Sequence, residues 1–253
     1  MRPFWLAAAM LIAGPARADV TARYTMGPEP NMMPAMVVEV NDHGDARIAM
    51  GHQSAMIMLD GVLYLIQADL LGIYAARWDD LTALLTERIH VTMPPVEAPD
   101  RRGHPPASPV PAFIERGTEI VAGRTGTLWS QRVDNGHGQP VYGVDVVISS
   151  DPDLAPLGHI FARQFETAQS GLRTMLGSGA AAATSPNFGD QMRVLLARGA
   201  PLRMGNIMRL ESVDTRPIPA SEFVLPGSPL TRAQLEARLG WGPVSAAPGD
   251  RAH

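Results

Sequence analysis

The sequence predicts an α+β fold in which one curled antiparallel sheet of eight to ten strands holds two or three helices in its concave face. Two observations lead to this prediction. The first part of the chain is a succession of short β-type segments, and the turns between them are too short for parallel crossovers. Further along, one long segment repeats its apolar residues every three or four positions, which is typical of an amphipathic helix. Such a helix needs a partner for its apolar face, and the sheet is the nearest one.

The first strands follow from runs of β-forming residues and from the turn signals between them. These runs span residues 20–26, 35–41, 46–50, 55–59 and 62–67. The clearest turn signal is Asp60-Gly61, a two-residue hairpin turn with apolar strands on both sides. Because links of this length join neighbouring antiparallel strands, the pattern predicts a meander.

Over residues 68–89 the spacing of the apolar residues changes to the three-to-four-residue period of a helix. One helical face is marked by Leu70, Tyr74, Trp78, Leu81 and Leu85. Asp69 is a suitable N-cap, although Gly72 weakens the first turn and allows a start as late as Asp79. Residues 93–111 then contain seven prolines in nineteen positions, which predicts an extended loop across the surface.

The middle of the chain predicts a strand, a hairpin turn, a second strand and a long helix. The strands are expected over 119–129 and 141–148, and the Asn-Gly pair and second glycine of residues 134–138 predict the turn. The apolar face of the helix consists of Leu157, Ile160, Phe161, Phe165, Ala168, Leu172, Met175 and Leu176.

The remaining segments predict two helices and two strands. Residues 189–198 are expected to form a short helix that ends at Gly199, a natural C′ residue. Strands are expected over 201–204 and 207–214, followed by an extended segment over 217–226. Thr231 and Gln234 form a capping-box pattern that starts a terminal helix.

The first 18 residues have the three parts of an export signal. Arg2 precedes a ten-residue apolar run, and Ala16-Arg-Ala18 is a small-x-small cleavage site. The run is about half the roughly 20 residues that a membrane-spanning helix needs. The chain contains no cysteine, which excludes disulfides and a lipid-bearing cysteine after the signal. We therefore expect a periplasmic protein with no integral membrane segment after cleavage.

Charge and composition set the domain organisation and bear on two classes of partner. The formal net charge is −4, too small to attract nucleic acid or anionic lipid. We expect one domain over residues 19–226, interrupted by the proline-rich loop 93–111. Residues 227–253 then form a terminal helix and a loose tail.

Two features resemble an uncharacterised exported family related to the LolA/LolB lipoprotein carriers. One is Ile120-Val-Ala-Gly-Arg-Thr-Gly-Thr-Leu-Trp129, which resembles that family's Ala-Gly turn followed by an exposed strand. The other is the end of the chain, with Gly199-Ala-Pro-Leu-Arg203, Glu211-Ser-Val213 and Ile218-Pro-Ala-Ser-Glu-Phe-Val-Leu-Pro226. The resemblance spans roughly residues 19–226. It implies a strongly curved half-barrel wrapped around helices, with an apolar cavity between them.

A helix inside a curved sheet leaves a cavity that prefers an acyl chain or another hydrophobic molecule. The large side chains expected to line it are Tyr64, Trp129, Tyr142, Phe161 and Phe165. The leading hypothesis is a non-catalytic exported binding or carrier protein for a lipid-like ligand.

Two alternatives come from other classes. Methionine and histidine suit copper, and the candidate ligands are Met32, Met33, Met36 and His43. Methionine also fills irregular apolar gaps and lines adaptable pockets, which explains the same residues without a metal. The other alternative is a structural or partner-binding protein whose cavity is simply its core.

The sequence offers no set of catalytic groups and no cofactor motif. The seven histidines are scattered and form no His-x-x-x-His pair, and no Gly-x-Ser-x-Gly elbow is present. Phosphate-loop and dinucleotide-binding fingerprints are absent as well. We therefore expect neither an enzyme nor a bound cofactor.

Overall fold

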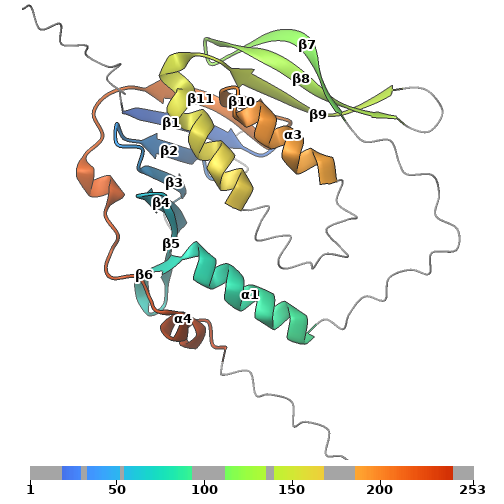
Figure 1. Ribbon diagram of the computed structural model, residues 1–253. Coiled ribbons are helices and arrows are strands. Elements are labelled where there is room, and N and C mark those ends of the chain that lie inside the picture. Colours follow the sequence, from blue (N-terminus) through green and yellow to red (C-terminus); the bar gives the residue numbers. More distant parts are fainter. Residues whose placement is uncertain are drawn as a thin grey trace, which may run out of the picture.

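The structure is a computed structural model that describes residues 19–29, 33–51, 54–92, 112–134, 140–167 and 186–241 (Figure 1). The strands are β1 (Val20–Met26), β2 (Met36–Val40), β3 (Ala46–Met50), β4 (Ser54–Leu59), β5 (Val62–Asp69), β6 (Gly72–Arg77), β7 (Ala112–Val121), β8 (Arg124–Asp134), β9 (Pro140–Ser149), β10 (Ala200–Met204) and β11 (Met208–Asp214). The helices are α1 (Trp78–Thr92), a helix over 155–167, α3 (Pro186–Leu196) and α4 (Arg232–Arg238), with short 3₁₀ turns η1 (Pro152–Leu154) and η2 (Ala220–Phe223).

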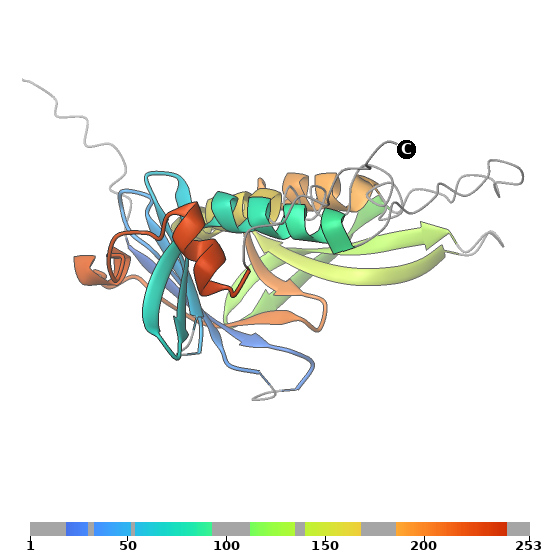
Figure 2. The same ribbon diagram turned by 90° about the horizontal axis from the view of Figure 1, so that it is seen from below.

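All eleven strands belong to one antiparallel sheet, whose order is β6-β5-β4-β3-β2-β1-β11-β10-β9-β8-β7. Its two edges are therefore β6 and β7, and the sheet is open. Because side chains alternate between the two faces of a strand, cross-strand partners share a face. One such row is Ala22, Val38, Ile48, Met56, Leu65 and Ala76. We call the face that carries this row the inner face, and α1, the 155–167 helix and α3 lie on that side (Figure 2).

The main core lies between the inner face and two of the helices. It combines apolar residues of the central strands with Leu154, Leu157 and Phe161 from the 155–167 region, and with Met192 and Leu196 of α3. The Phe161 ring meets Tyr24 of β1 edge-on, with ring centroids 5.5 Å apart at 82°. The Tyr24 hydroxyl donates a hydrogen bond of 3.1 Å to the Pro201 carbonyl, and burial raises the pKa of this phenol.

Glycine allows the 155–167 helix to approach the chain that leads into β10. A Cβ atom on Gly158 would lie 2.7 Å from the carbonyl carbon and oxygen of Gly199. Gly199 itself has a φ of 159° and faces the Ser149 carbonyl so closely that a side chain has no room. The helix is therefore seated against the backbone, which fixes its height above the sheet.

A second, smaller core joins α1 and α4 to β6. It contains the buried side chains of Tyr74, Ala76, Leu84 and Leu235. Leu230 pairs with Ala76 as an isolated bridge, and its N–H donates to the Ala75 carbonyl over 2.8 Å. The segment before α4 thus covers the β6 edge, which would otherwise present unpaired backbone groups.

The α+β class and the large antiparallel sheet agree with the sequence prediction, although the sheet has eleven strands instead of eight to ten. The Asp60-Gly61 turn is confirmed, with φ values of 49° and 77° and Leu59 paired to Val62. The terminal capping box is confirmed as well, since Thr231 and Gln234 exchange their side-chain and backbone hydrogen bonds.

The helix predicted over 68–89 is wrong in its first half. Residues 72–77 form strand β6, and α1 begins at Trp78. The apolar residues Leu70, Tyr74 and Trp78 are four apart, and a spacing of four fits both the helical period and the two-residue period of a strand. Gly72, with a φ of 110°, is the first residue of β6 and directly follows the Leu70-Leu71 turn.

The single strand predicted over 119–129 is also wrong. The region forms the end of β7 and the start of β8, joined by a turn at Ala122-Gly123 with φ values of 50° and 74°. Alanine rarely adopts positive φ, so the strand pattern did not reveal the turn.

Several predictions lie outside the described residues. They are the signal over 1–18, the proline-rich loop over 93–111, most of the 134–138 turn, the helix beyond 167 and the tail from 242. Within the described ranges, no helix combines the length and apolar character needed to cross a membrane.

Candidate functional site: a cavity beneath the 155–167 helix

A cavity of about 670 Å³ lies under the first turns of the 155–167 helix, at the end of the sheet where β2 joins β3 and β4 joins β5. Its lining consists of Val40, Asn41, Gly44, Met58, Gly61, Pro152, Asp153, Ala155, Pro156, His159, Ile160, Arg163 and Thr215. This volume falls within the range of roughly 300–1,000 Å³ that small-molecule sites occupy.

The chain that precedes the helix fixes where the cavity begins. Asp151 is the N-cap of η1, and its carboxylate accepts a hydrogen bond of 3.0 Å from the Asp153 N–H. Pro152 follows at a position where a missing N–H costs nothing. The second carboxylate oxygen of Asp151 pairs with Arg124 at 2.5 Å, which ties this corner to the start of β8.

Two different stripes of the helix meet the sheet. Leu157 and Phe161 are four residues apart and are buried in the main core. Pro156, Ile160 and Arg163 form the neighbouring stripe and line the cavity. The same helix therefore closes the core with one stripe and contributes to the lining of the cavity with the next.

Arg163 spans the mouth of the cavity. Its guanidinium donates a hydrogen bond of 3.1 Å to the carbonyl of Gly61, 102 residues away in the chain. Glycine suits this position for two reasons: its φ is 77°, and a Cβ there would lie 3.1 Å from the Arg163 nitrogen. In the tight β4–β5 turn, no side chain at Gly61 obstructs the approach of Arg163 to the Gly61 carbonyl.

The lining consists of an apolar part, which we call the floor, and a set of polar groups. Val40, Met58 and Ile160 supply aliphatic and thioether surface, and all three are buried in the core cluster on their other side. Asn41, Asp153, His159, Arg163 and Thr215 supply the polar groups of the lining. Such an arrangement accommodates a molecule with an apolar body and a polar end.

The five aromatic residues predicted to line a cavity are dispersed in the structure. None of them belongs to the lining of the cavity described above. Phe161 is 7% exposed in the main core, and Phe165 and Trp129 pack against that core from its margin. Tyr142 is 45% exposed and lies under the guanidinium of Arg116, 4.3 Å from the ring centroid.

Tyr64 lies on the other side of the sheet. Its neighbour Leu65 belongs to the inner-face row with Met56, so strand alternation places Tyr64 on the outer face. The helices are on the inner side, and Tyr64 therefore cannot share a cavity with Phe161 across the same sheet face.

The predicted methionine and histidine ligands do not gather at one point. Met36 is buried at the start of β2, whereas His43 lies beyond the other end of that strand, next to the Asp42 carboxylate. Four strand steps alone separate the ends by about 13 Å, so one ion cannot contact both residues. Met33 is exposed, and Met32 lies outside the described residues.

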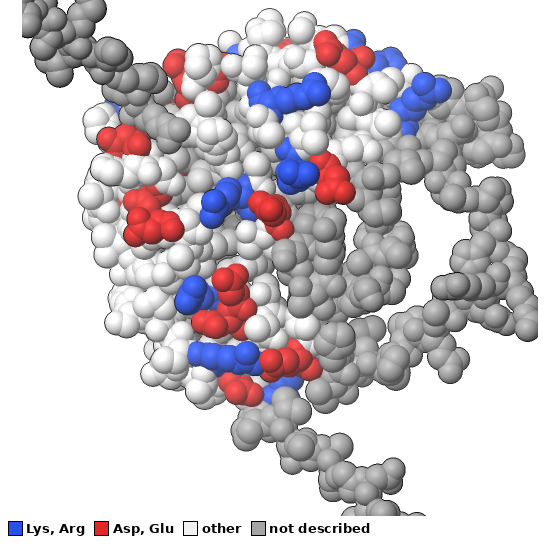
Figure 3. All heavy atoms as spheres, in the orientation of Figure 1, with Lys and Arg blue, Asp and Glu red and all other residues white. Residues whose placement is uncertain are grey.

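Charged side chains of the described surface are mostly arranged in pairs of opposite sign. On the face seen in Figure 3, arginines and carboxylates lie next to one another. Arg232 pairs with Glu87, and Arg88 with Glu236 at 3.8 Å, which links α4 to α1. Among the described residues, no group of three His, Asp or Glu side chains is placed to hold a metal ion.

Sequence reasoning identified part of this site. Ile160 was expected on the apolar face of the helix. Arg163 was missed, because its partner is a backbone carbonyl of a distant turn and no local pattern indicates it.

Comparisons of the chain with protein-family models, with curated proteins and with solved structures found no match. The resemblance to the LolA/LolB-related family therefore stays a prediction.

Proposed function

We propose that this is a non-catalytic binding or carrier protein for a hydrophobic, lipid-like molecule, held in the cavity beneath the 155–167 helix. The observation that supports this best is the division of the cavity, with Val40, Met58 and Ile160 below and Arg163 at the mouth. An acyl chain would cover the floor, because burying apolar surface is favourable by about 25 cal/mol per Å². A carboxylate at its end would lie near the guanidinium of Arg163.

The finer fold and the location belong to the same proposal. A half-barrel of the kind that the resemblance to the LolA/LolB-related family implies would enclose such a ligand between an open, curved sheet and the helices on one side. Export by the signal over residues 1–18 would place the carrier in the periplasm. Copper binding by Met32, Met33, Met36 and His43 is less favoured, because Met36 and His43 are at opposite ends of β2.

A solvatochromic fatty-acid probe tests the proposal by fluorescence titration. We expect saturable binding by the wild type and its loss in Ile160→Asp, because an unpaired carboxylate in the floor is costly next to an acyl chain. Ile160→Trp provides a second variant that stays apolar and narrows the cavity, so it should weaken probe binding. The matched control is Val194→Asp, since Val194 is an exposed residue of α3 outside the cavity.

The polar end is tested separately. Arg163→Gln should weaken binding of a fatty-acid probe by about tenfold, the value of one charge-assisted hydrogen bond of about 1.4 kcal/mol. The same variant should bind the corresponding fatty alcohol as the wild type does. Absence of saturable binding in the wild type, or binding that survives both Ile160 variants, would contradict the proposal.

A further inference from the structure

The exposed apolar side chains of this protein are concentrated at one end of the sheet. Ten large apolar residues are exposed among the described residues, and six of them lie in or next to four strand connections at this end. They are Met33, Met50, Leu70, Leu71, Ile73 and Ile207, and we call them the apolar rim. Leu70, Leu71, Ile73 and Ile207 are exposed by 104%, 76%, 65% and 64%.

The topology explains why these residues come together. In an antiparallel meander, alternate connections lie at the same end of the sheet, so the β1–β2, β3–β4 and β5–β6 connections share one end. The β10–β11 turn joins them, because Met26 at the end of β1 pairs with Met208 at the start of β11. At a strand spacing of about 4.8 Å, the four connections form a row roughly 30 Å long. Figure 2 shows this end of the sheet along its lower edge, away from α1, the 155–167 helix and α3.

The opposite end of the strands has a different chemistry. Its connections carry the carboxylates of Asp19, Asp42, Asp45, Asp60 and Asp214. Several of these carboxylates accept hydrogen bonds from the backbone of the turns, as Asp19 does from the Asp42 N–H at 3.0 Å. We call this end the acidic rim, and the cavity beneath the 155–167 helix lies at this end.

The β5–β6 turn is built by residues other than its two leucines. The Asp69 carboxylate accepts a hydrogen bond of 2.7 Å from the Leu71 N–H, and Gly72 supplies the positive φ. Arg238 donates to both oxygens of Asp69, at 2.7 and 2.6 Å, and to the Gly72 carbonyl at 2.9 Å. Turn geometry therefore explains Asp69 and Gly72 but gives no reason for Leu70 and Leu71, where polar residues are usual. The turn is held in place by Asp69, Gly72 and Arg238, and it leaves both leucines exposed.

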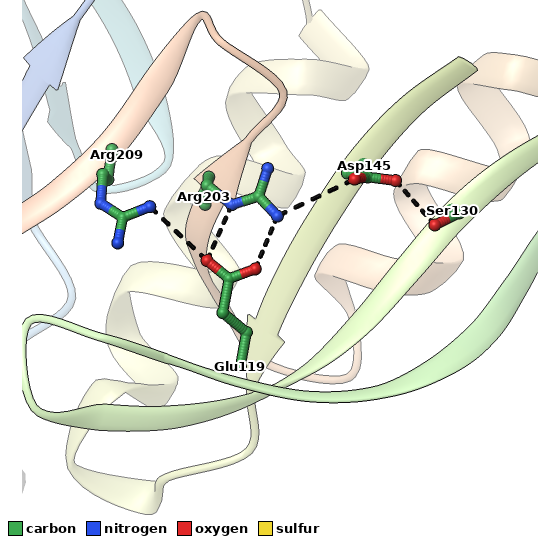
Figure 4. A network of polar contacts seen from close by, with 5 residues as sticks. All are labelled: Glu119, Ser130, Asp145, Arg203 and Arg209. Carbon is green, nitrogen blue, oxygen red and sulfur yellow. Dashed lines mark hydrogen bonds and ion pairs between the residues drawn. The ribbon is translucent and has the colours of Figure 1, made fainter. Parts of the chain in front are cut away.

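A groove of about 310 Å³ is lined by Asn206 and Met208, the two neighbours of Ile207, and by three charged residues of the network drawn in Figure 4. Its charged lining residues are Arg203, Arg209 and Glu119. Both arginines pair with the one carboxylate: Arg203 at 2.6 Å and Arg209 at 3.5 Å. Asp145 lies farther off, 4.0 Å from Arg203, and accepts a hydrogen bond from Ser130. Arg209 is half exposed and has the weaker hold on Glu119, so it can reach an anionic group next to the rim.

We propose that the apolar rim docks on the surface of a phospholipid bilayer, with its aliphatic tips in the interface and Arg209 at the level of the lipid phosphates. The acidic rim and the mouth of the ligand cavity then face away from the bilayer. This inference goes beyond the proposed function and does not depend on it, because it rests on residues that line no part of the cavity.

The arrangement of the apolar rim favours a lipid bilayer over a cleft of a partner protein or a second copy of this chain. Its side chains stand on separate turns spaced about two strands, or roughly 10 Å, apart along a row, instead of forming one compact patch. Protein interfaces concentrate their binding energy in a central cluster rich in Trp, Tyr and Arg. A row of aliphatic tips with the half-exposed Arg209 beside it matches the layering of a lipid surface, in which acyl chains lie below the phosphates.

The absence of cysteine in the sequence allows a direct test with single labels. Leu71→Cys, at the apolar rim, and His43→Cys, at the acidic rim, each carry an environment-sensitive fluorophore on the full mature chain. With phosphatidylcholine vesicles we expect a blue shift of the Leu71 label and none of the His43 label. A shift of both labels, or of neither, would overturn the proposal.

Vesicle flotation supplies the matched comparison. The variant Leu70→Ser, Leu71→Ser and Ile207→Ser should lose about tenfold or more of the vesicle-bound fraction, because each aliphatic side chain contributes to transfer into the interface. Val224→Ser together with Val194→Ser removes two exposed apolar residues away from the rim and should bind vesicles as the wild type does. Equal losses in both variants, or a rim variant that changes only the self-association measured by sedimentation, would overturn the proposal.

Discussion

The replacement Phe161→Ala tests whether the 155–167 helix has the two distinct stripes described above. Phe161 is 7% exposed and meets Tyr24 edge-on in the main core, whereas Ile160 is 5% exposed but lines the cavity. An aromatic side chain buries about 150–250 Å², which at about 25 cal/mol per Å² corresponds to ~4–6 kcal/mol. Alanine retains part of this area, and core Phe→Ala changes cost about 3–5 kcal/mol. We expect the free energy of unfolding to fall by about 4 kcal/mol.

The neighbouring change should behave differently. Ile→Ala in a closed core costs about 2–5 kcal/mol, and part of this is the void left behind. At Ile160 one side of the residue is already open to the cavity, so we expect a loss at or below about 2 kcal/mol, the low end of that range. Both values are obtained from urea unfolding at one temperature, with the denaturant dependence checked for each variant.

The two variants should also separate in ligand binding. Phe161→Ala should leave the affinity for the fatty-acid probe within about twofold, because changes at sites without shared partners are nearly independent. Ile160→Ala enlarges the floor and should alter that affinity. The reasoning would be refuted if Ile160→Ala cost as much stability as Phe161→Ala, or if Phe161→Ala alone abolished probe binding.

Three further predictions concern other parts of the molecule. The hydrogen bonds from Arg238 lower the pKa of Asp69 in the folded state. The stability that they provide is therefore present above the unfolded pKa of about 3.9, and it is lost as the pH falls through the pKa of the folded state. The melting temperature of Asp69→Asn should thus lie below that of the wild type at pH 7 and approach it at pH 3; a gap independent of pH would refute this. A Cβ on Gly126 would lie 2.7 Å from a methyl carbon of Val147. Gly126→Ala should therefore lower the free energy of unfolding, measured in urea, by about 1–3 kcal/mol. A neutral change would show that β8 and β9 can separate freely. Intact mass of the exported protein should correspond to a chain that starts at Asp19, and a retained leader would contradict the export signal.

The parts of the fold that the sequence predicts are those fixed by local chemistry. The Asp60-Gly61 turn was predictable because these residues tolerate the backbone angles that a two-residue hairpin demands. The capping box of Thr231 and Gln234 was predictable because both partners lie within one helical turn.

The errors have equally local causes. Strand β6 was taken for the start of a helix because Leu70, Tyr74 and Trp78 fit both periods, and nothing within the segment decides between them. The decision comes from pairing with β5, whose register places Tyr74 opposite Gln67. The Ala122-Gly123 turn escaped the strand pattern because alanine is a poor indicator of positive φ.

The candidate site was predictable only in outline. The helical period identifies Ile160 and Phe161 as apolar-face residues, but it does not say which of the two core residues also borders the cavity. That difference depends on what lies across from each, namely Tyr24 for Phe161 and the ends of β2 and β4 for Ile160. The hydrogen bond from Arg163 to the Gly61 carbonyl joins positions 102 residues apart, which no local pattern specifies.

Native mass spectrometry of the protein, purified gently from its own compartment, tests the central claim most directly. The account predicts a population that carries one extra mass of a few hundred daltons, as a lipid-like molecule has. The same preparation of Ile160→Trp, in which the cavity is narrowed, should carry less of that mass. A wild-type protein that never carries the extra mass, or an Ile160→Trp protein that carries it equally, would contradict the claim that the cavity beneath the 155–167 helix binds such a ligand.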